Sequence, residues 1–107
     1  MELKELQKDV SEVFLNNLKR DGIENSDDYL LLKLTEEVGE LIQAFLIHQK
    51  RCRKEKYISE EESKKELSKE LSDVAGLVFV ISMVFNIDLE EAIIKKWITR
   101  EWVKKGK

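Results

Sequence analysis

The chain has 107 residues, of which 42% are apolar and 38% are charged, and its formal net charge is −3. This length predicts that residues 1–107 form one domain with a modest core, and the acidic balance argues against nucleic-acid binding, which needs a basic face. Because the chain has no proline and only four glycines, we expect an all-α fold built from long helices.

Neither a membrane nor an oxidising compartment is expected. The longest apolar run, Val74 to Phe85, is shorter than the roughly 18 residues of a membrane span. Cys52 is the only cysteine, so it has no partner for an internal disulfide, and the first segment, MELKELQKDV, is too charged for a signal peptide. We therefore expect a cytoplasmic protein without a membrane partner.

Apolar residues at helical spacing predict two helices in the first half of the chain. The first helix should cover about residues 3–19 and end near Asp21–Gly22. Asn25 or Ser26 can cap the second helix, whose apolar stripe continues to the basic tract HQKRCRK at residues 48–54. This tract should be a solvated turn whose cations complement the helix dipole, and His48 should be a solvated residue at the helix end.

Two further helices are predicted in the second half, each with a capping signal. Ser59 with Glu62 forms a capping box for the third helix, and Asp88 with Glu91 forms an acidic version for the fourth. The third helix is apolar on every side from Val74 to Phe85, and such a helix has to be covered all round. A small four-helix chain can hardly enclose it, so we expect a homodimer or homotetramer interface here; a merely central helix is the alternative.

Four carboxylates are arranged symmetrically about the turn between the second and third helices. Glu37 and Glu40 flank the apolar stripe of the second helix, and Glu70 and Asp73 flank that of the third. Glu37 and Asp73 lie at equal distances along the chain from residue 55, and so do Glu40 and Glu70. The helical pattern breaks at residue 55. An antiparallel hairpin turning at this point would bring the four groups to one height.

Converging carboxylates repel one another and lose hydration, so we expect cations to neutralise them. Oxygen ligands suit Mg²⁺, with Mn²⁺ as an alternative. The competing interpretation is that acidic pairs at this spacing are solvated surface and that Lys33 pairs with Glu37. Because two pairs match in register beside apolar stripes, we favour the metal site.

The fourth helix carries cations among its apolar positions. In a continuous helix Lys96 and Arg100 would lie on the same face as apolar residues, and they could bind polyphosphate oxygens or instead reach solvent or pair with acids. Trp97 and Trp102 could stack on a nucleobase or belong to the core.

The segments EEVGE (36–40) and ELSD (70–73) resemble the MazG-like all-α nucleoside triphosphate pyrophosphohydrolases, which are identified by EExxE and ExxD on successive helices. The resemblance extends from about Tyr29 through Arg100. It implies a four-helix MazG-like bundle with a central antiparallel hairpin. It also implies roles for individual residues: Mg²⁺ ligands at Glu37, Glu40, Glu70 and Asp73; an acid at Glu36 that holds a further metal or orients the attacking water; and phosphate contacts at Lys96 and Arg100. Trp97 is a further candidate for contact with the substrate, because its ring can stack on a base.

The resemblance further implies hydrolysis of an NTP or dNTP to the monophosphate and pyrophosphate, with either house-cleaning of damaged nucleotides or trimming of the normal nucleotide pool as its role. A di-iron carboxylate bundle would need a Glu-x-x-His motif, but Phe45 stands three residues before His48. A non-catalytic helical module that dimerises through residues 74–85 is the remaining alternative.

Overall fold

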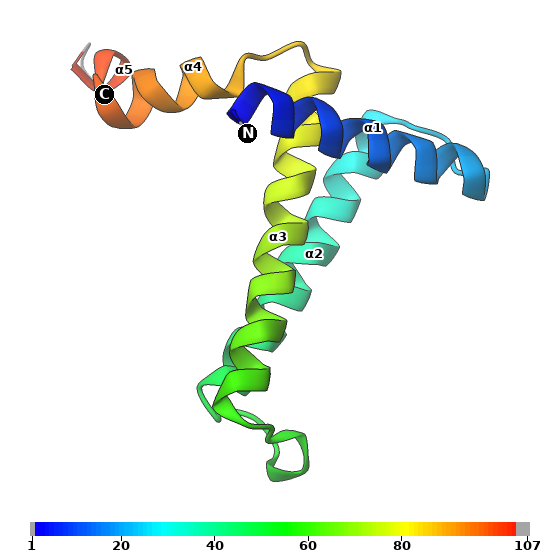
Figure 1. Cartoon of the computed structure of the whole chain (residues 1–107), viewed down its shortest axis with the longest axis vertical. Coiled ribbons are helices and arrows are strands. Elements are labelled where there is room, and N and C mark those ends of the chain that lie inside the picture. The colour runs from blue at the N-terminus through cyan, green and yellow to red at the C-terminus, as the bar shows by residue number, and fades with distance from the viewer. Residues whose placement is uncertain (1, 105–107) are drawn as a thin grey trace. The chain divides into compact units, whose positions relative to one another are not determined.

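The computed structural model describes residues 2–104, and within this range it contains helices and no strand (Figure 1). The all-α prediction is therefore confirmed. None of these helices combines the length and apolar character that crossing a bilayer requires. The elements are α1 (Leu3–Asp21), α2 (Asp27–His48), the 3-10 turn η1 (Lys54–Lys56), α3 (Glu60–Val84), α4 (Leu89–Ile93), the π-helical turn η2 (Ile94–Ile98) and α5 (Glu101–Lys104).

The chain divides into two compact units, and the boundary falls within α3. The first unit contains Met1–Ile23 and Phe79–Lys107, and the second contains Glu24–Val78. The single domain expected from the chain length stays a prediction.

The second unit is an antiparallel hairpin of α2 and the first part of α3 (Figure 1). The Ser26 hydroxyl caps α2 by accepting the Tyr29 N–H at 3.1 Å. At the start of α3, the Ser59 hydroxyl accepts the Glu62 N–H at 3.1 Å and donates to the Glu62 carboxylate at 3.1 Å. Since η1 contains residue 55, the predicted turn and both predicted caps are confirmed.

In the first unit, a buried glutamine joins α1 to the last turn of α3. The Gln7 amide donates to the Ser82 hydroxyl and, at 3.3 Å, to the Ile87 carbonyl. Lys4 forms an ion pair with Asp88 at 3.3 Å, and Asp88 also caps α4 by accepting the Glu91 N–H at 3.1 Å. These contacts hold α1 against the connection between α3 and α4.

The predicted fourth helix is interrupted, and its expected continuous register was wrong. The Thr99 N–H bonds to the Ile94 carbonyl, a π-helical spacing, and Arg100 has a left-handed backbone with φ of 58°. The Thr99 hydroxyl bonds to the Ile94 carbonyl at 3.4 Å and to the Glu101 carboxylate at 3.0 Å, so it competes with regular helical pairing. Because of the π turn and the reversal at Arg100, Lys96 and Arg100 do not share one regular helical face.

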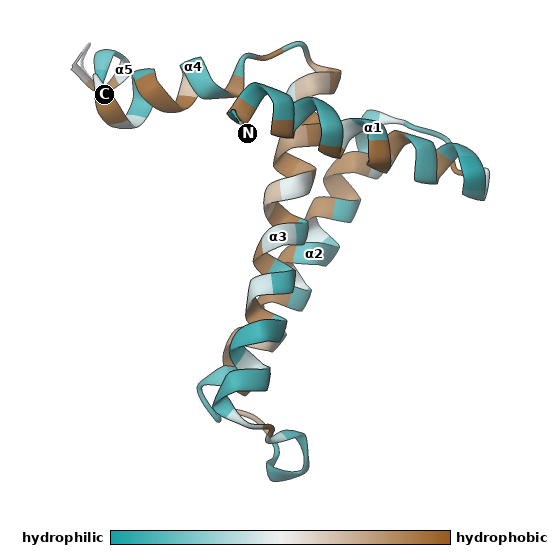
Figure 2. Cartoon of the chain, in the orientation of Figure 1, coloured by the Kyte–Doolittle hydropathy of each residue, from teal (hydrophilic) through white to brown (hydrophobic). Residues whose placement is uncertain are grey.

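Much of the apolar surface of the chain is exposed. Figure 2 shows α3 hydrophilic near its start and hydrophobic toward its end. Within the apolar run of residues 74–85, Leu77 and Val80 are buried, whereas Met83 and Phe85 are exposed at 43% and 51%. The apolar run of α3 is therefore only partly covered within one chain, and the predicted oligomer stays a prediction.

Two glycines provide a matched test of backbone strain. Gly22 ends α1 with φ of 69°, whereas Gly39 lies within α2, and an added Cβ would meet no atom within 4 Å at either position. We expect Gly22→Ala to lower the free energy of unfolding by about 1 kcal/mol, since its φ disfavours an L side chain. Gly39→Ala should raise it by about 0.5 to 1 kcal/mol through better helix propensity. Denaturant unfolding followed by circular dichroism would measure both; equal effects would contradict the expectation.

Candidate metal centre

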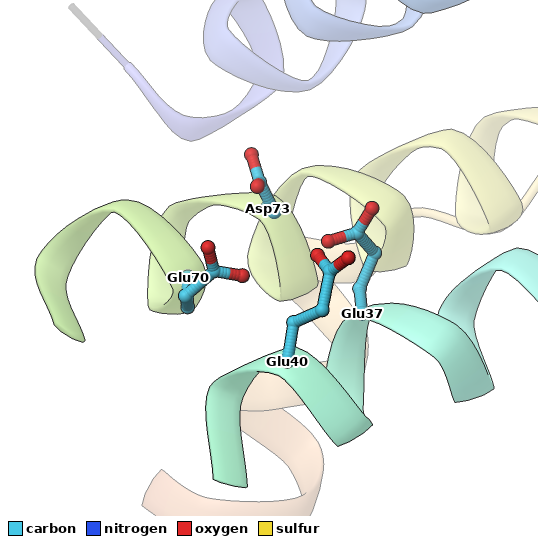
Figure 3. A group of neighbouring side chains, drawn as sticks. All are labelled: Glu37, Glu40, Glu70 and Asp73. Atoms are coloured by element: carbon cyan, nitrogen blue, oxygen red, sulfur yellow. The ribbon is translucent and has the colours of Figure 1, made fainter. Parts of the chain in front are cut away.

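Four acidic side chains converge between the two helices of the hairpin. Glu37 and Glu40 of α2 and Glu70 and Asp73 of α3 each offer a carboxylate oxygen, and these oxygens all lie within 4.8 Å of one another. Figure 3 shows the two glutamates of α2 extending toward α3, where the other two acids lie. The sequence register thus correctly predicted which groups meet, and their role as metal ligands stays a prediction.

The apolar core of the hairpin positions these carboxylates. Leu30 and Ala44 of α2 and Leu77 of α3 are buried, with 1%, 8% and 4% of their surface exposed. Residues three apart on a helix lie on the same side of it, so each acidic pair follows one edge of this core. Glu37 is consequently buried as well, with 9% exposed.

Two carboxylate oxygens in the cluster have no protein partner. The Oε2 atoms of Glu37 and Glu70 are buried and accept no hydrogen bond from residues 2–104. A buried polar oxygen without a partner carries an unfavourable desolvation cost. A cation bound among the four acids would satisfy both oxygens, and an all-carboxylate set suits a hard divalent ion. The residues present therefore fit Mg²⁺ or Mn²⁺.

The cluster also retains protons more strongly than ordinary carboxylates do. Burial, the neighbouring Glu40 carboxyl group and the negative charge of Asp73 raise the pKa of Glu37 from 4.5 to about 7, against a smaller lowering by Lys33. Burial is likewise the main cause that raises the pKa of Glu70, followed by Glu40 and Asp73. Without a cation, the site therefore holds a proton near neutral pH.

Lys33 brings one positive charge to the edge of the cluster. Its Nζ atom lies 2.7 Å from Glu36 Oε1 and 3.7 Å from Glu37 Oε1. The pairing of Lys33 with Glu37, which the sequence allowed as an alternative to a metal site, is thus present. One ammonium group cannot balance four carboxylates, so this ion pair and a metal ion are compatible.

Glu36 does not belong to the convergent group. Its side chain is 56% exposed, and the partner found for it within residues 2–104 is Lys33. Glu36 directly precedes Glu37 in α2, and both carboxylates lie near the Lys33 ammonium group, so Glu36 stands beside the four acids. Its proposed part in orienting water stays a prediction.

The predicted substrate residues of the last helix belong to the other unit. Lys96, Trp97 and Arg100 are exposed there. Trp97 and Trp102 are 69% and 47% exposed, so neither is the core residue that sequence reasoning allowed. Their contacts with substrate stay a prediction.

His48 is not the fully solvated residue that its position at a helix end predicted. It is half-buried, and its Nδ1 atom lies 2.7 Å from the hydroxyl oxygen of Ser63, which is buried. Ser63 also donates to the Glu60 carbonyl at 2.9 Å. Residues 48 and 63 are nearly equidistant from the turn, so the register that relates the carboxylates would also have paired these two residues.

A pocket of about 320 Å³ adjoins the carboxylates on the hairpin. Glu40 and Glu70 belong both to the acidic cluster and to the wall of this pocket. Sequence reasoning missed the pocket, because its lining combines residues with no motif in common. The remaining lining residues are Gln43, Ala44, Ile47, Ile58, Ser63 and Glu66.

An all-α hairpin with four convergent carboxylates defines a class of helical proteins able to bind divalent metal. The family model of the MazG nucleotide pyrophosphohydrolase domain matches residues 25–103. The chain belongs to this family, which confirms the resemblance inferred from EEVGE and ELSD. No curated protein and no solved structure shows significant similarity to the chain.

The raised pKa of Glu37 predicts a pH dependence of stability without metal. Because the folded state binds this proton more tightly than the unfolded chain does, the free energy of unfolding should fall as pH rises from 4.5 through about 7. The contribution is complete below pH 4.5 and lost above about 7. Denaturant unfolding in EDTA across this range should show a steeper fall for the natural protein than for Glu37→Gln; identical slopes would refute the assignment.

Proposed function

We propose that this protein is a Mg²⁺-dependent nucleoside triphosphate pyrophosphohydrolase that converts an NTP or dNTP to the monophosphate and pyrophosphate. The observation that carries the proposal is the group of four carboxylates within 4.8 Å, two of them with buried, unpartnered oxygens. Membership of a family described as nucleotide pyrophosphohydrolases supports the reaction class. A role in nucleotide-pool house-cleaning in the cytoplasm is part of the same proposal.

Glu37, Glu40, Glu70 and Asp73 would hold the metal, Mg²⁺ or alternatively Mn²⁺. When bound, the ion supplies charge neutralisation for phosphate oxygens and a lower pKa for a coordinated water. In the reaction the water oxygen forms a bond to phosphorus, and the anhydride bond between the α- and β-phosphates breaks. Phosphoryl chemistry depends mainly on positioning and charge neutralisation, which such a cluster can provide.

Glu36 is the proposed acid that orients the attacking water or holds a further metal. Its ion pair with Lys33 at 2.7 Å restrains the carboxylate next to the cluster. Glu36 is exposed, so its carboxylate can accept a hydrogen bond from water. In this proposal Lys33 is a positioning residue.

Lys96 and Arg100 are the proposed contacts to the polyphosphate, and Trp97 is a proposed contact to the nucleotide. All three side chains are exposed and available to a ligand. Arg100 presents a planar fork that can bind two phosphate oxygens, and Lys96 acts as a point charge.

The second candidate function is a non-catalytic helical module that dimerises. The observation in its favour is an exposed apolar stripe on α2, formed by Leu31, Val38, Ile42 and Phe45, which are 37% to 58% exposed. At about 100° per residue these positions share one face, and Glu40 lies on the opposite side of the helix.

We propose that a second copy of the chain covers this stripe, in a homodimer or homotetramer. Such an assembly leaves the carboxylate side accessible and is compatible with the enzyme.

The reaction is tested with Mg²⁺, a panel of NTPs, dNTPs and modified nucleotides, and separate detection of monophosphate, pyrophosphate and orthophosphate. We expect monophosphate with pyrophosphate and no turnover in EDTA. Glu37→Gln and Asp73→Asn should each lower kcat at least about a hundredfold, since even indirect ligand support contributes tenfold to a hundredfold. Glu12→Gln, an exposed change on α1, should leave turnover unchanged. An active Glu37→Gln protein would remove the metal assignment, and silence across the panel would favour the helical module.

The assembly is tested by light scattering coupled to size-exclusion chromatography. We expect the natural protein to have the mass of a dimer or tetramer, and Val38→Lys with Ile42→Lys to shift the mass toward the monomer, because two charges in an apolar interface are costly. Leu32→Lys is the matched control, because Leu32 is 69% exposed but lies off the stripe. A natural protein that is strictly monomeric would refute the assembly.

A further inference from the structure

The pocket on the hairpin begins where the acidic cluster ends. Glu40 and Glu70 line it, and the same two residues belong to the four-carboxylate group. All of its walls belong to Glu24–Val78, so it is complete within one compact unit. A ligand whose anionic end is held at the carboxylates through metal ions would extend its other end into this pocket.

The chemistry of the lining differs from that of a phosphate site. Ala44, Ile47 and Ile58 supply apolar surface, and no Lys, Arg or His is among the residues that line the pocket within the described chain. A polyphosphate would find no positive charge here, whereas a flat, partly apolar heterocycle would bury its faces. The volume of about 320 Å³ is in the range of small-molecule sites.

Apart from Glu40 and Glu70, which belong to the acidic cluster, the polar lining groups are Gln43, Ser63 and Glu66. Ser63 is already bonded to His48 and to the Glu60 carbonyl, and Glu66 forms an ion pair with Lys69 at 3.3 Å. Gln43 lines the pocket and is exposed, so its amide is open to a ligand. An amide offers both donors and an acceptor, so it can pair with the polar edge of a base.

We infer that the pocket binds the nucleoside part of the substrate, with the base against Ile47 and Ile58 and the Gln43 amide reading its polar edge. This inference rests on the proposed function, because the phosphates must be held at the carboxylates for the base to enter the pocket. It assigns base selectivity to α2 itself. Without the amide, a polar group of the bound base has no hydrogen-bond partner in the protein. The binding free energy should then be less favourable.

The test uses AMP, GMP, CMP and UMP, each with Mg²⁺, and methyl NMR of the isoleucines. The δ1 methyl signals of Ile47 and Ile58 should shift with saturation for the preferred base, and those of Ile23 and Ile87 in the other unit should shift less. Gln43→Leu, which retains most of the side-chain volume, should weaken the preferred monophosphate at least about tenfold and reduce the differences among the four bases. Gln49→Leu, an exposed glutamine outside the pocket lining, is the matched control.

Ile47→Trp provides an independent variant. By filling the pocket, it should abolish monophosphate binding while leaving Mg²⁺ binding, measured by calorimetry, unchanged. Unaltered affinity and base preference in both Gln43→Leu and Ile47→Trp would overturn the inference.

Failure of the inference and failure of the proposed function give different results. If the natural protein hydrolyses triphosphates but Gln43→Leu and Ile47→Trp both retain the natural affinity and base preference, only the pocket assignment fails. If monophosphates bind in the pocket but no triphosphate is hydrolysed, the pocket assignment stands and the enzyme proposal fails. The absence of both binding and hydrolysis overturns both.

Discussion

The convergence of four like charges beside one apolar core, with Glu37 buried among them, is the constraint on which the rest of this structure depends. Packing around Leu30, Ala44 and Leu77 holds α2 and α3 together, and the same packing forces the Glu37 carboxylate out of water. The protein can relieve this cost by protonation, which explains the raised pKa of Glu37, or by binding a divalent cation. A cation that binds here has to displace the proton held by Glu37, so the affinity of the site for metal should depend on pH.

The hairpin combines two kinds of chemistry on one side of two helices. Carboxylates at Glu37, Glu40, Glu70 and Asp73 provide a hard, anionic site, and the next turns toward the connection provide an apolar pocket with an amide. This succession matches the polarity of a nucleotide, whose charged phosphates are joined to a flat heterocycle. The half-buried His48 bonds to Ser63, which lines the pocket, so His48 fixes the position of one lining side chain.

The family match begins at residue 25, so α1 lies outside it. The contacts of α1 are structural: Gln7 bonds to Ser82 and Ile87, and Lys4 pairs with Asp88. The Gln7 bonds satisfy the hydrogen-bonding groups of Ser82 and Ile87 near the end of α3, where a buried group without a partner would be destabilising. The segment that carries Lys96 and Arg100 is not a regular helix, because a π turn and the left-handed backbone of Arg100 interrupt it. Lys96 and Arg100 therefore do not share one helical face.

Residue spacing predicted the helical class, the caps at Ser59 and Asp88, a cap at Asn25 or Ser26, and the four acids that meet across the hairpin. These features depend on local hydrogen bonding, helical periodicity and symmetry about a short turn, which can be read from residue spacing. Tertiary structure alone decided which carboxylate oxygens are buried without partners, that His48 bonds to Ser63, and that a pocket adjoins the acids. It also decided the break between Ile94 and Arg100. Desolvation, cavity shape and competition between side-chain and backbone hydrogen bonds depend on atoms brought together in three dimensions, so spacing along the chain does not contain them.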